Sequence, residues 1–417
     1  MKTSNYWLAL AVTALGLSGL FTILLIIGRT TNALPPEFFP PALIVHVNLD
    51  VLVWLLAMTA SHFNIQKKPH KPIAFFIAAI GTAMITISPF TGGIAYENNY
   101  IPIFDNMLFK TGIALFLGAI AYESITVIFS EAKYKTKTIA ALIIMSFAAF
   151  VASYQGITDK TSSHAFFEAL FWGGGHILQF AYVQIMLLAW MILAAKGGVR
   201  VPISQRVKYF VFTLPLIFVA FSTVFIYASS AVESSQHIQL FTQMMIFGTG
   251  IAAIPLGLLL LIGLILSTRW NLYSVTLALS MLLFAIGGAL GNTAAQGLAN
   301  GEVTTIIPAH YHFSSVAVTI ALMGYVFSRL NIQKSSLCMW QIILYTIGQI
   351  CYFSGMAIFG GHGAARKTPG VDMIMMDEST KKMVQGIMHG GGSLSLIGGI
   401  LFVVIVIKHF KNSSLRA

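Results

Sequence analysis

Twelve long apolar segments, almost free of charged residues, dominate this sequence. The chain has 417 residues, of which 57% are hydrophobic and only 9% charged, and its mean hydropathy is +0.82. These values lie far outside the range of a soluble domain, and about 20 consecutive apolar residues are enough to cross a bilayer as a helix. We therefore predict an all-α integral membrane protein, a bundle of twelve transmembrane helices. The predicted helices are residues 7–27, 41–61, 73–93, 107–128, 138–156, 166–195, 208–229, 238–267, 271–291, 308–328, 338–360 and 384–408.

The positive charges fall mainly on one side of this predicted bundle. Of the 24 lysines and arginines, 17 lie near the chain ends or in the loops that follow even-numbered helices. Because short cytoplasmic loops are enriched in lysine and arginine, both termini are predicted to be cytoplasmic. The net charge of +11 thus reflects orientation in a lipid bilayer, and no nucleic-acid partner is expected.

The sequence shows no soluble domain, long linker or internal repeat, so residues 1–417 are predicted to form a single membrane domain. The first apolar segment lacks a small-residue cleavage site and is predicted to be a retained anchor. Cys338 and Cys351 lie in one predicted helix, about 20 Å apart along its axis, and cannot pair. There is no CxxCH motif, so no c-type haem is attached to this chain.

Six histidines, in or directly before five of the predicted helices, lie at a similar depth, in the outer part of the bilayer. Ionisable groups inside a membrane are costly, so such a layer indicates a functional site. Neutral imidazole is a good axial ligand of haem iron, and helix bundles build cofactor sites from facing helices. Two of the six, His310 and His312, differ by a rotation of about 200° on a helix and must serve different neighbours. The six are His46, His176, His237, His310, His312 and His389.

Several motifs resemble subunit I of the haem-copper oxidase superfamily, in particular the C-type cytochrome c oxidases and the nitric oxide reductases. "AHYHF" around His310 resembles the tenth helix of that family, and "HVNLDVLVWLL" from His46 resembles its second helix. "FWGGGHILQF" around His176 resembles its sixth helix, and "HIQLFTQMM" begins at His237, where the family has a histidine pair. "GGHGAARKTPG" resembles the loop before its last helix. The resemblance covers essentially the whole chain and implies the twelve-helix bundle of subunit I.

The resemblance also implies a set of ligands. His46 and His312 would bind a low-spin haem, and His310 would bind a high-spin haem. His176 and His237 would bind a second metal, copper or non-haem iron. The propionates of the haems would be held by two basic residues, Arg366 and Lys367.

The sequence departs from the family pattern around the second metal. "SSQHIQ" offers one histidine where the family has two, and His389 and His164 remain alternatives for a third ligand. Phe180 stands where mitochondrial-type oxidases have a tyrosine. In C-type enzymes the tyrosine comes from the seventh helix, which makes Tyr227 a candidate catalytic residue. Nitric oxide reductases require a glutamate near the iron, which makes Glu168 another.

The function implied is that of a respiratory oxidoreductase, in which electrons pass from the low-spin haem to the high-spin haem and second metal, where O2 is reduced to water. Nitric oxide reduction and a non-catalytic haem-binding role with a degenerate copper site are the alternatives. A transporter is disfavoured because the histidine layer is off the bilayer centre. The expected electron donor is cytochrome c or a membrane-anchored c-type cytochrome subunit, with quinol also possible. The expected location is a bacterial inner membrane, with the haems near the periplasmic side.

Overall fold

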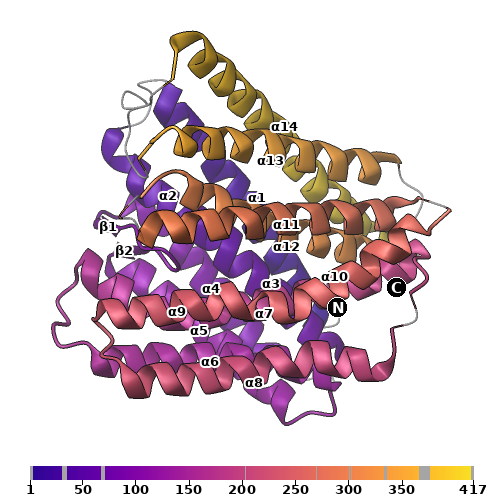
Figure 1. Cartoon of the computed structure of the whole chain (residues 1–417), viewed down its shortest axis with the longest axis horizontal. Coiled ribbons are helices and arrows are strands. Elements are labelled where there is room, and N and C mark those ends of the chain that lie inside the picture. The colour runs from indigo at the N-terminus through magenta and orange to yellow at the C-terminus, as the bar shows by residue number, and fades with distance from the viewer. Residues whose placement is uncertain are drawn as a thin grey trace. The chain divides into compact units, whose positions relative to one another are not determined.

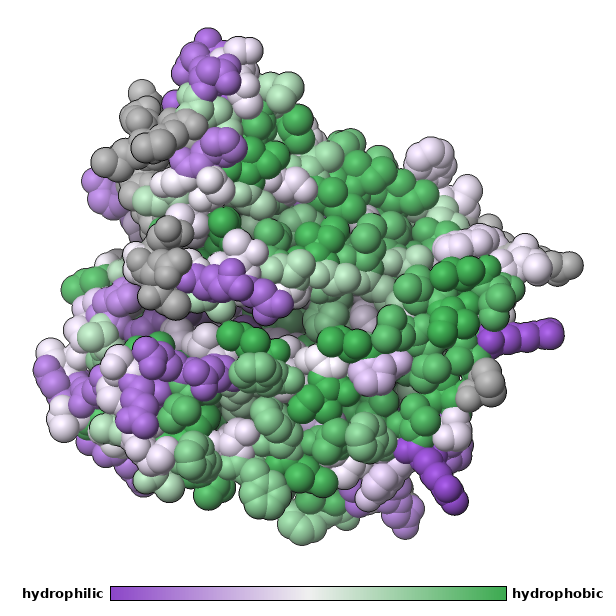
Figure 2. Space-filling view, viewed as in Figure 1, coloured by the Kyte–Doolittle hydropathy of each residue, from purple (hydrophilic) through white to green (hydrophobic). Residues whose placement is uncertain are grey.

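The structure is a computed structural model that describes residues 3–30, 35–66, 71–201, 203–268, 270–299, 301, 303–332, 336–365 and 376–414. Over these residues it has twelve helical spans long and apolar enough to cross a membrane, as the sequence predicts. Hydrophobic side chains cover much of the face seen in Figure 2. Phe221 and Phe247 are 75% and 70% exposed, which suits a surface that contacts lipid.

The first compact unit comprises Met1–Ile185 and Ser204–Ala253. Within it, α1 packs against α2 and α3, α4 against α5, and α8 against both α6 and α9. Its elements, many of them labelled in Figure 1, are α1 (Thr3–Thr30), η1 (Pro36–Phe38), α2 (Phe39–Val47), η2 (Asn48–Val53), α3 (Trp54–Gln66), α4 (Ile73–Ile87), η3 (Ser88–Phe90), β1 (Ile94–Tyr96), β2 (Ile103–Asp105), α5 (Met107–Ile128), α6 (Tyr134–Gly156), most of α7 (His164–Gly197), α8 (Gln205–Ser229) and α9 (Ser235–Gly248).

The second unit comprises Met186–Ile203 and Ile254–Ala417. In it α12 packs against α11 and α13, and α13 lies alongside α14 (Figure 1). Its elements are the end of α7, most of α10 (Gly250–Ile265), α11 (Leu272–Ala299), α12 (Ile306–Arg329), α13 (Ser336–Gly361) and α14 (Glu378–Ser414). The single membrane domain and the cytoplasmic location of both termini stay predictions.

The second membrane span is not a uniform α-helix. After His46 the backbone widens into the π-helix η2, and the α-helical pattern resumes at Trp54. Such π segments insert an extra residue into a helical turn and often mark functional sites, because they change the direction of the side chains on either side. The irregularity therefore supports a functional role for the region of His46.

A short antiparallel hairpin, which is absent from the helices predicted above, follows the third span. Its strands β1 and β2 pair Ala95 with Phe104. The Asp105 carboxylate lies 2.5 Å from Lys110 Nζ on α5. Burial raises the pKa of Asp105, but hydrogen bonds with Lys110 and Ser162 and the Lys110 charge outweigh it and hold the pKa below its ordinary value. These contacts fix the hairpin, whose connecting loop reaches the candidate site.

Candidate functional site

His310 is fixed against α11 with one ring nitrogen left available. Its Nδ1 lies 2.7 Å from the carbonyl oxygen of Gly287, and because a carbonyl only accepts, Nδ1 carries the proton. The lone pair of the neutral ring is therefore on Nε2. A Cβ on Gly291 would come within 2.6 Å of the ring at Cε1, so this glycine leaves room for the imidazole. Such anchoring of Nδ1 is what orients histidines that bind metals through Nε2.

His312 contacts a different neighbour. Its ring stacks on Phe353 of α13, with centroids 4.5 Å apart and planes 9° from parallel. The start of α12 is tied to the same helix, because Thr305 Oγ1 donates to the carbonyl of Met356 at 2.8 Å. His310 thus contacts α11 and His312 contacts α13, which agrees with the different directions expected from their two-residue spacing.

His46 is anchored to α1. Its Nδ1 lies 2.9 Å from Ser18 Oγ, 3.1 Å from the Ser18 carbonyl and 3.2 Å from Thr22 Oγ1. The Ser18 hydroxyl donates to the His46 carbonyl, and the Thr22 hydroxyl donates to the Ser18 carbonyl. Since both hydroxyl protons are already engaged, Nδ1 is the donor, and the lone pair again resides on Nε2.

His237 is a fully buried histidine with an unpaired nitrogen. Ser234 caps the start of α9, and its Oγ accepts from the His237 backbone N–H at 3.2 Å. The Nδ1 atom lies 3.1 Å from Ser230 Oγ, whose own proton is donated to the Ile226 carbonyl. Nδ1 is therefore the donor, and Nε2 is buried with no hydrogen-bond partner. A buried lone pair without a hydrogen-bond donor is costly, and it suits a ligand atom.

His176 lies in the same unit and is paired at both nitrogens. Its Nδ1 donates to the Trp172 carbonyl at 2.7 Å, one turn earlier on α7. Its Nε2 lies 2.8 Å from Tyr100 Oη, so the phenol donates to the imidazole. His176 and His237 both contact the ring of Phe241, with centroid distances of 5.7 and 5.0 Å. The structure thus places these two predicted metal ligands around one aromatic ring.

The three glycines before His176 each face an aromatic ring. A Cβ on Gly173 would lie 2.6 Å from Tyr227 Oη. A Cβ on Gly174 would overlap Phe150, and one on Gly175 would overlap the ring of Tyr100. The "GGG" sequence therefore lets aromatic side chains approach the backbone of α7 next to the histidine, as small residues do at helix contacts in membranes.

We expect Gly175→Ala to destabilise the protein by about 1–3 kcal/mol, because the new methyl group overlaps the ring of Tyr100 and displaces it. The measurement is thermal unfolding of the detergent-purified protein. The matched control is Gly118→Ala on α5, where a Cβ meets nothing within 4 Å. Equal thermal stabilities of the two variants would contradict the close contact between Gly175 and the ring of Tyr100.

The loop that carries Tyr100 is held by polar contacts. Asn98 Oδ1 accepts from the backbone N–H groups of Tyr100 and Ile101, at 3.0 and 2.9 Å. The carboxylate of Glu168 on α7 accepts from the Asn99 backbone N–H at 3.1 Å and from its side-chain amide. Glu168, predicted as a catalytic acid, thus holds the neighbour of Tyr100 in place; its catalytic role stays a prediction.

Tyr227, the other predicted catalytic residue, lies beside His237, with ring centroids 5.0 Å apart. Its Oη is 2.7 Å from Ser153 Oγ and donates to the Ala149 carbonyl at 3.0 Å. The hydroxyl therefore bonds to α6, and the rings of Tyr227 and His237 meet at a steep angle of 74°. A catalytic role for Tyr227 also stays a prediction.

The other predicted positions are less informative. His389 is exposed on α14. His164 Nε2 donates to the Glu97 carbonyl at 2.8 Å, which is the tautomer opposite to that of the four anchored histidines. Arg366 and Lys367 lie outside the described residues. Within the described part of the chain, no group of three or more His, Cys, Asp or Glu side chains is arranged to hold a metal.

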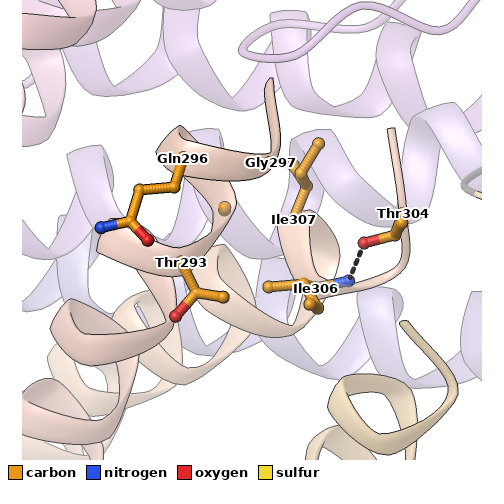
Figure 3. Close-up of a pocket in the computed structure, with 7 residues that line it drawn as sticks. Thr293, Gln296, Gly297, Thr304, Ile306 and Ile307 are labelled. Atoms are coloured by element: carbon orange, nitrogen blue, oxygen red, sulfur yellow. Dashed lines mark hydrogen bonds between the residues drawn. The ribbon is translucent and has the colours of Figure 1, made fainter. Parts of the chain in front are cut away.

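A cavity of about 190 Å³ lies between the end of α11 and the start of α12 (Figure 3), where Ile306 and Ile307 precede His310 by about one turn. Thr293, Gln296 and Thr304 supply polar groups to its wall. Thr304 forms an isolated antiparallel bridge with Ala365. The chain immediately before Arg366 is therefore close to the helix start that carries His310.

Four of the predicted ligands share one chemical state. His46, His176, His237 and His310 all hold the proton on Nδ1 and carry the lone pair on Nε2. This is the form in which imidazole binds iron or copper through Nε2. At His46, His237 and His310 the Nδ1 partner is not the carbonyl one turn back on the same helix, which is the bond made by His362 and His409. The donor set fits haem iron at His46 and His310, and a second metal at His237.

Comparisons with known proteins agree with the bundle. No known family model matches the sequence. An uncharacterised protein of Rickettsia prowazekii (strain Madrid E) is 27% identical, over 96% of this chain and 94% of that protein. One of Aquifex aeolicus (strain VF5) is 26% identical, over 78% and 84%. A cryo-EM structure of a haem-copper terminal oxidase dimer superposes with a TM-score of 0.73 and 16% identity, over 98% of this chain and 84% of that chain. The chain therefore has the predicted twelve-helix fold of the haem-copper oxidases.

Proposed function

We propose that this protein is a membrane haem protein of the subunit I type that reduces O2 to water, with electrons passing from a bis-histidine low-spin haem to a high-spin haem and a second metal. The observation that carries the proposal is the common tautomer of the anchored histidines, which presents Nε2 from separate helices of the oxidase fold.

The residues have separate tasks in this proposal. His46 and His312 hold the low-spin haem, and His310 holds the high-spin haem. Haems and a second metal, when bound, would relay electrons from the donor and offer two binding points for a diatomic gas. Ser18 and the Gly287 carbonyl fix the planes of the His46 and His310 rings through Nδ1. His46 and His312 belong to different units, so their pairing on one haem stays a prediction.

Arg366 and Lys367 are proposed to bind haem propionates. The support comes from the residues just before them, since the Ala364 carbonyl accepts from the Thr305 backbone N–H at 3.0 Å. This contact brings the chain to the start of α12, on which His310 and His312 stand one and two turns further. An arginine fork matches a carboxylate in shape and charge.

The proposed partners rest on the resemblance of the sequence motifs to subunit I. We propose a bacterial inner membrane, with cytochrome c or a membrane-anchored c-type cytochrome subunit delivering electrons from the periplasmic side. The second metal is copper or non-haem iron. Nitric oxide is the second candidate substrate, and the assay below separates it from O2.

The test is reduced-minus-oxidised absorption spectroscopy of the purified protein, with and without carbon monoxide. We expect about two haems per chain, one of which shifts its bands with carbon monoxide because its sixth position is open. The reduced protein should consume O2 faster than NO. Two haems with no carbon monoxide response would support the non-catalytic alternative, and absence of haem would refute the proposal.

A further inference from the structure

The second-metal site has two histidines in its predicted ligand set, and the structure brings a third donor to one of them. Tyr100 Oη is 2.8 Å from His176 Nε2. Neither the sequence motifs nor the fold comparison points to this residue, which comes from the hairpin loop and not from a membrane helix. We propose that Tyr100 is a ligand of the second metal, together with His176 and His237. This inference rests on the proposed function, because it completes the metal site named there.

The distance between the two atoms is the first argument. Two ligand atoms that each lie about 2.1 Å from one metal, at an angle of about 90°, are about 2.9 Å apart. The observed 2.8 Å between Oη and Nε2 is thus also a separation that neighbouring ligands on one ion have. On metal binding the phenol O–H bond and its hydrogen bond to His176 Nε2 would break, Oη and Nε2 would each bond the metal, and the phenol proton would leave to solvent. No oxidation or reduction is involved.

The construction around Tyr100 is the second argument. The absence of a side chain at Gly175 admits its ring, which packs edge-on against Trp172 with centroids 5.6 Å apart. Asn98 binds its backbone N–H, and Glu168 binds the adjacent Asn99. Contacts of this kind hold a ligand in position around a metal.

The chemistry of the remaining donors is the third argument. His237 Nε2 is buried and unpaired. Trp172 Nε1 donates at 3.3 Å to the carbonyl of Ile238, so α7 and α9 are joined one turn before His176 and one residue after His237. Two imidazoles and a phenolate form a nitrogen and oxygen donor set that suits iron or copper. In this proposal Tyr100 supplies the third ligand, in place of the second histidine that is missing from "SSQHIQ".

The experiment compares three tyrosine variants of the full-length purified protein. Haem is quantified separately, and iron beyond haem iron, together with copper, is measured by mass spectrometry. We expect about one such metal per chain in the parent protein and loss of it in Tyr100→Phe, which keeps the ring against Gly175. Tyr96→Phe is the matched control in the same hairpin, since Tyr96 Oη donates only to the Ser162 carbonyl at 3.1 Å, and it should retain the metal.

A spectroscopic signature separates ligation from a structural role. Resonance Raman spectra of the parent protein should show metal-bound tyrosinate vibrations, which vanish in Tyr100→Phe. Tyr100→His should keep the metal and lose these vibrations. If Tyr100→Phe loses haem as well as the second metal, retention of the metal by Tyr100→His shows that position 100 supplies a ligand. Full metal retention in Tyr100→Phe, or a parent protein with haem but no other metal, would overturn the inference. Haem with a carbon monoxide response would leave the proposed haem chemistry standing in either case.

Discussion

His310→Ala is expected to remove the haem that responds to carbon monoxide and to stop O2 consumption. The ring of His310 is oriented by the Gly287 carbonyl and fits into the space that Gly291 leaves, and alanine removes the Nε2 atom that this arrangement presents. The haem content should fall from about two to about one per chain, and the remaining haem should be the six-coordinate one. Haem quantification and carbon monoxide difference spectra measure both effects.

The matched control for this change is His362→Ala. His362 is an exposed histidine of the same unit whose Nδ1 bonds the Ile358 carbonyl of its own helical turn at 2.8 Å. It should leave both haems and the activity unchanged. Added imidazole should partly restore the carbon monoxide response of His310→Ala, since the deleted side chain leaves a cavity of its own shape. A normal carbon monoxide response in His310→Ala without imidazole would show that His310 is not the ligand.

The membrane architecture could be predicted from the sequence because lipid imposes a simple rule on it. Backbone groups in a bilayer must be paired within the chain, so each long apolar segment is a helix. This rule does not predict breaks within a span: the structure divides the segment 238–267 into α9 and α10 at Thr249. The π-helix after His46 was not predictable either, because "HVNLDVLVW" is equally apolar in an α-helix.

The candidate site was predictable only in part, for a physical reason. Histidines are rare enough in membrane helices that their positions alone indicate function. Tyr100 gives no such signal, because tyrosine is common at membrane interfaces and this one stands in a loop. Its relation to His176 depends on a contact across 76 residues of sequence, and the only local trace of it is Gly175, whose lack of a side chain has several possible reasons.

His46→Ala is expected to have the opposite effect on the two haems from His310→Ala. The low-spin haem should be lost and the carbon monoxide response of the other haem kept, because His310 is held in a different unit. O2 consumption with an external donor should fall to background, since electrons lose their entry point. Reduced-minus-oxidised spectra measure the haem lost, and stopped-flow reduction measures electron entry.

Two further variants separate ligation by His46 from its packing. Ser18→Ala removes one of the Nδ1 partners but leaves the Ser18 carbonyl, so it should keep the haem and weaken its binding by about tenfold. His409→Ala, which removes a histidine bonded to Ile405 in its own helical turn, should behave as the parent protein. If His46→Ala lost the carbon monoxide response and kept the six-coordinate haem, the two ligand assignments would have to be exchanged. The two alanine variants at His46 and His310 thus test the assignment of each haem independently, because each should spare the signal that the other removes.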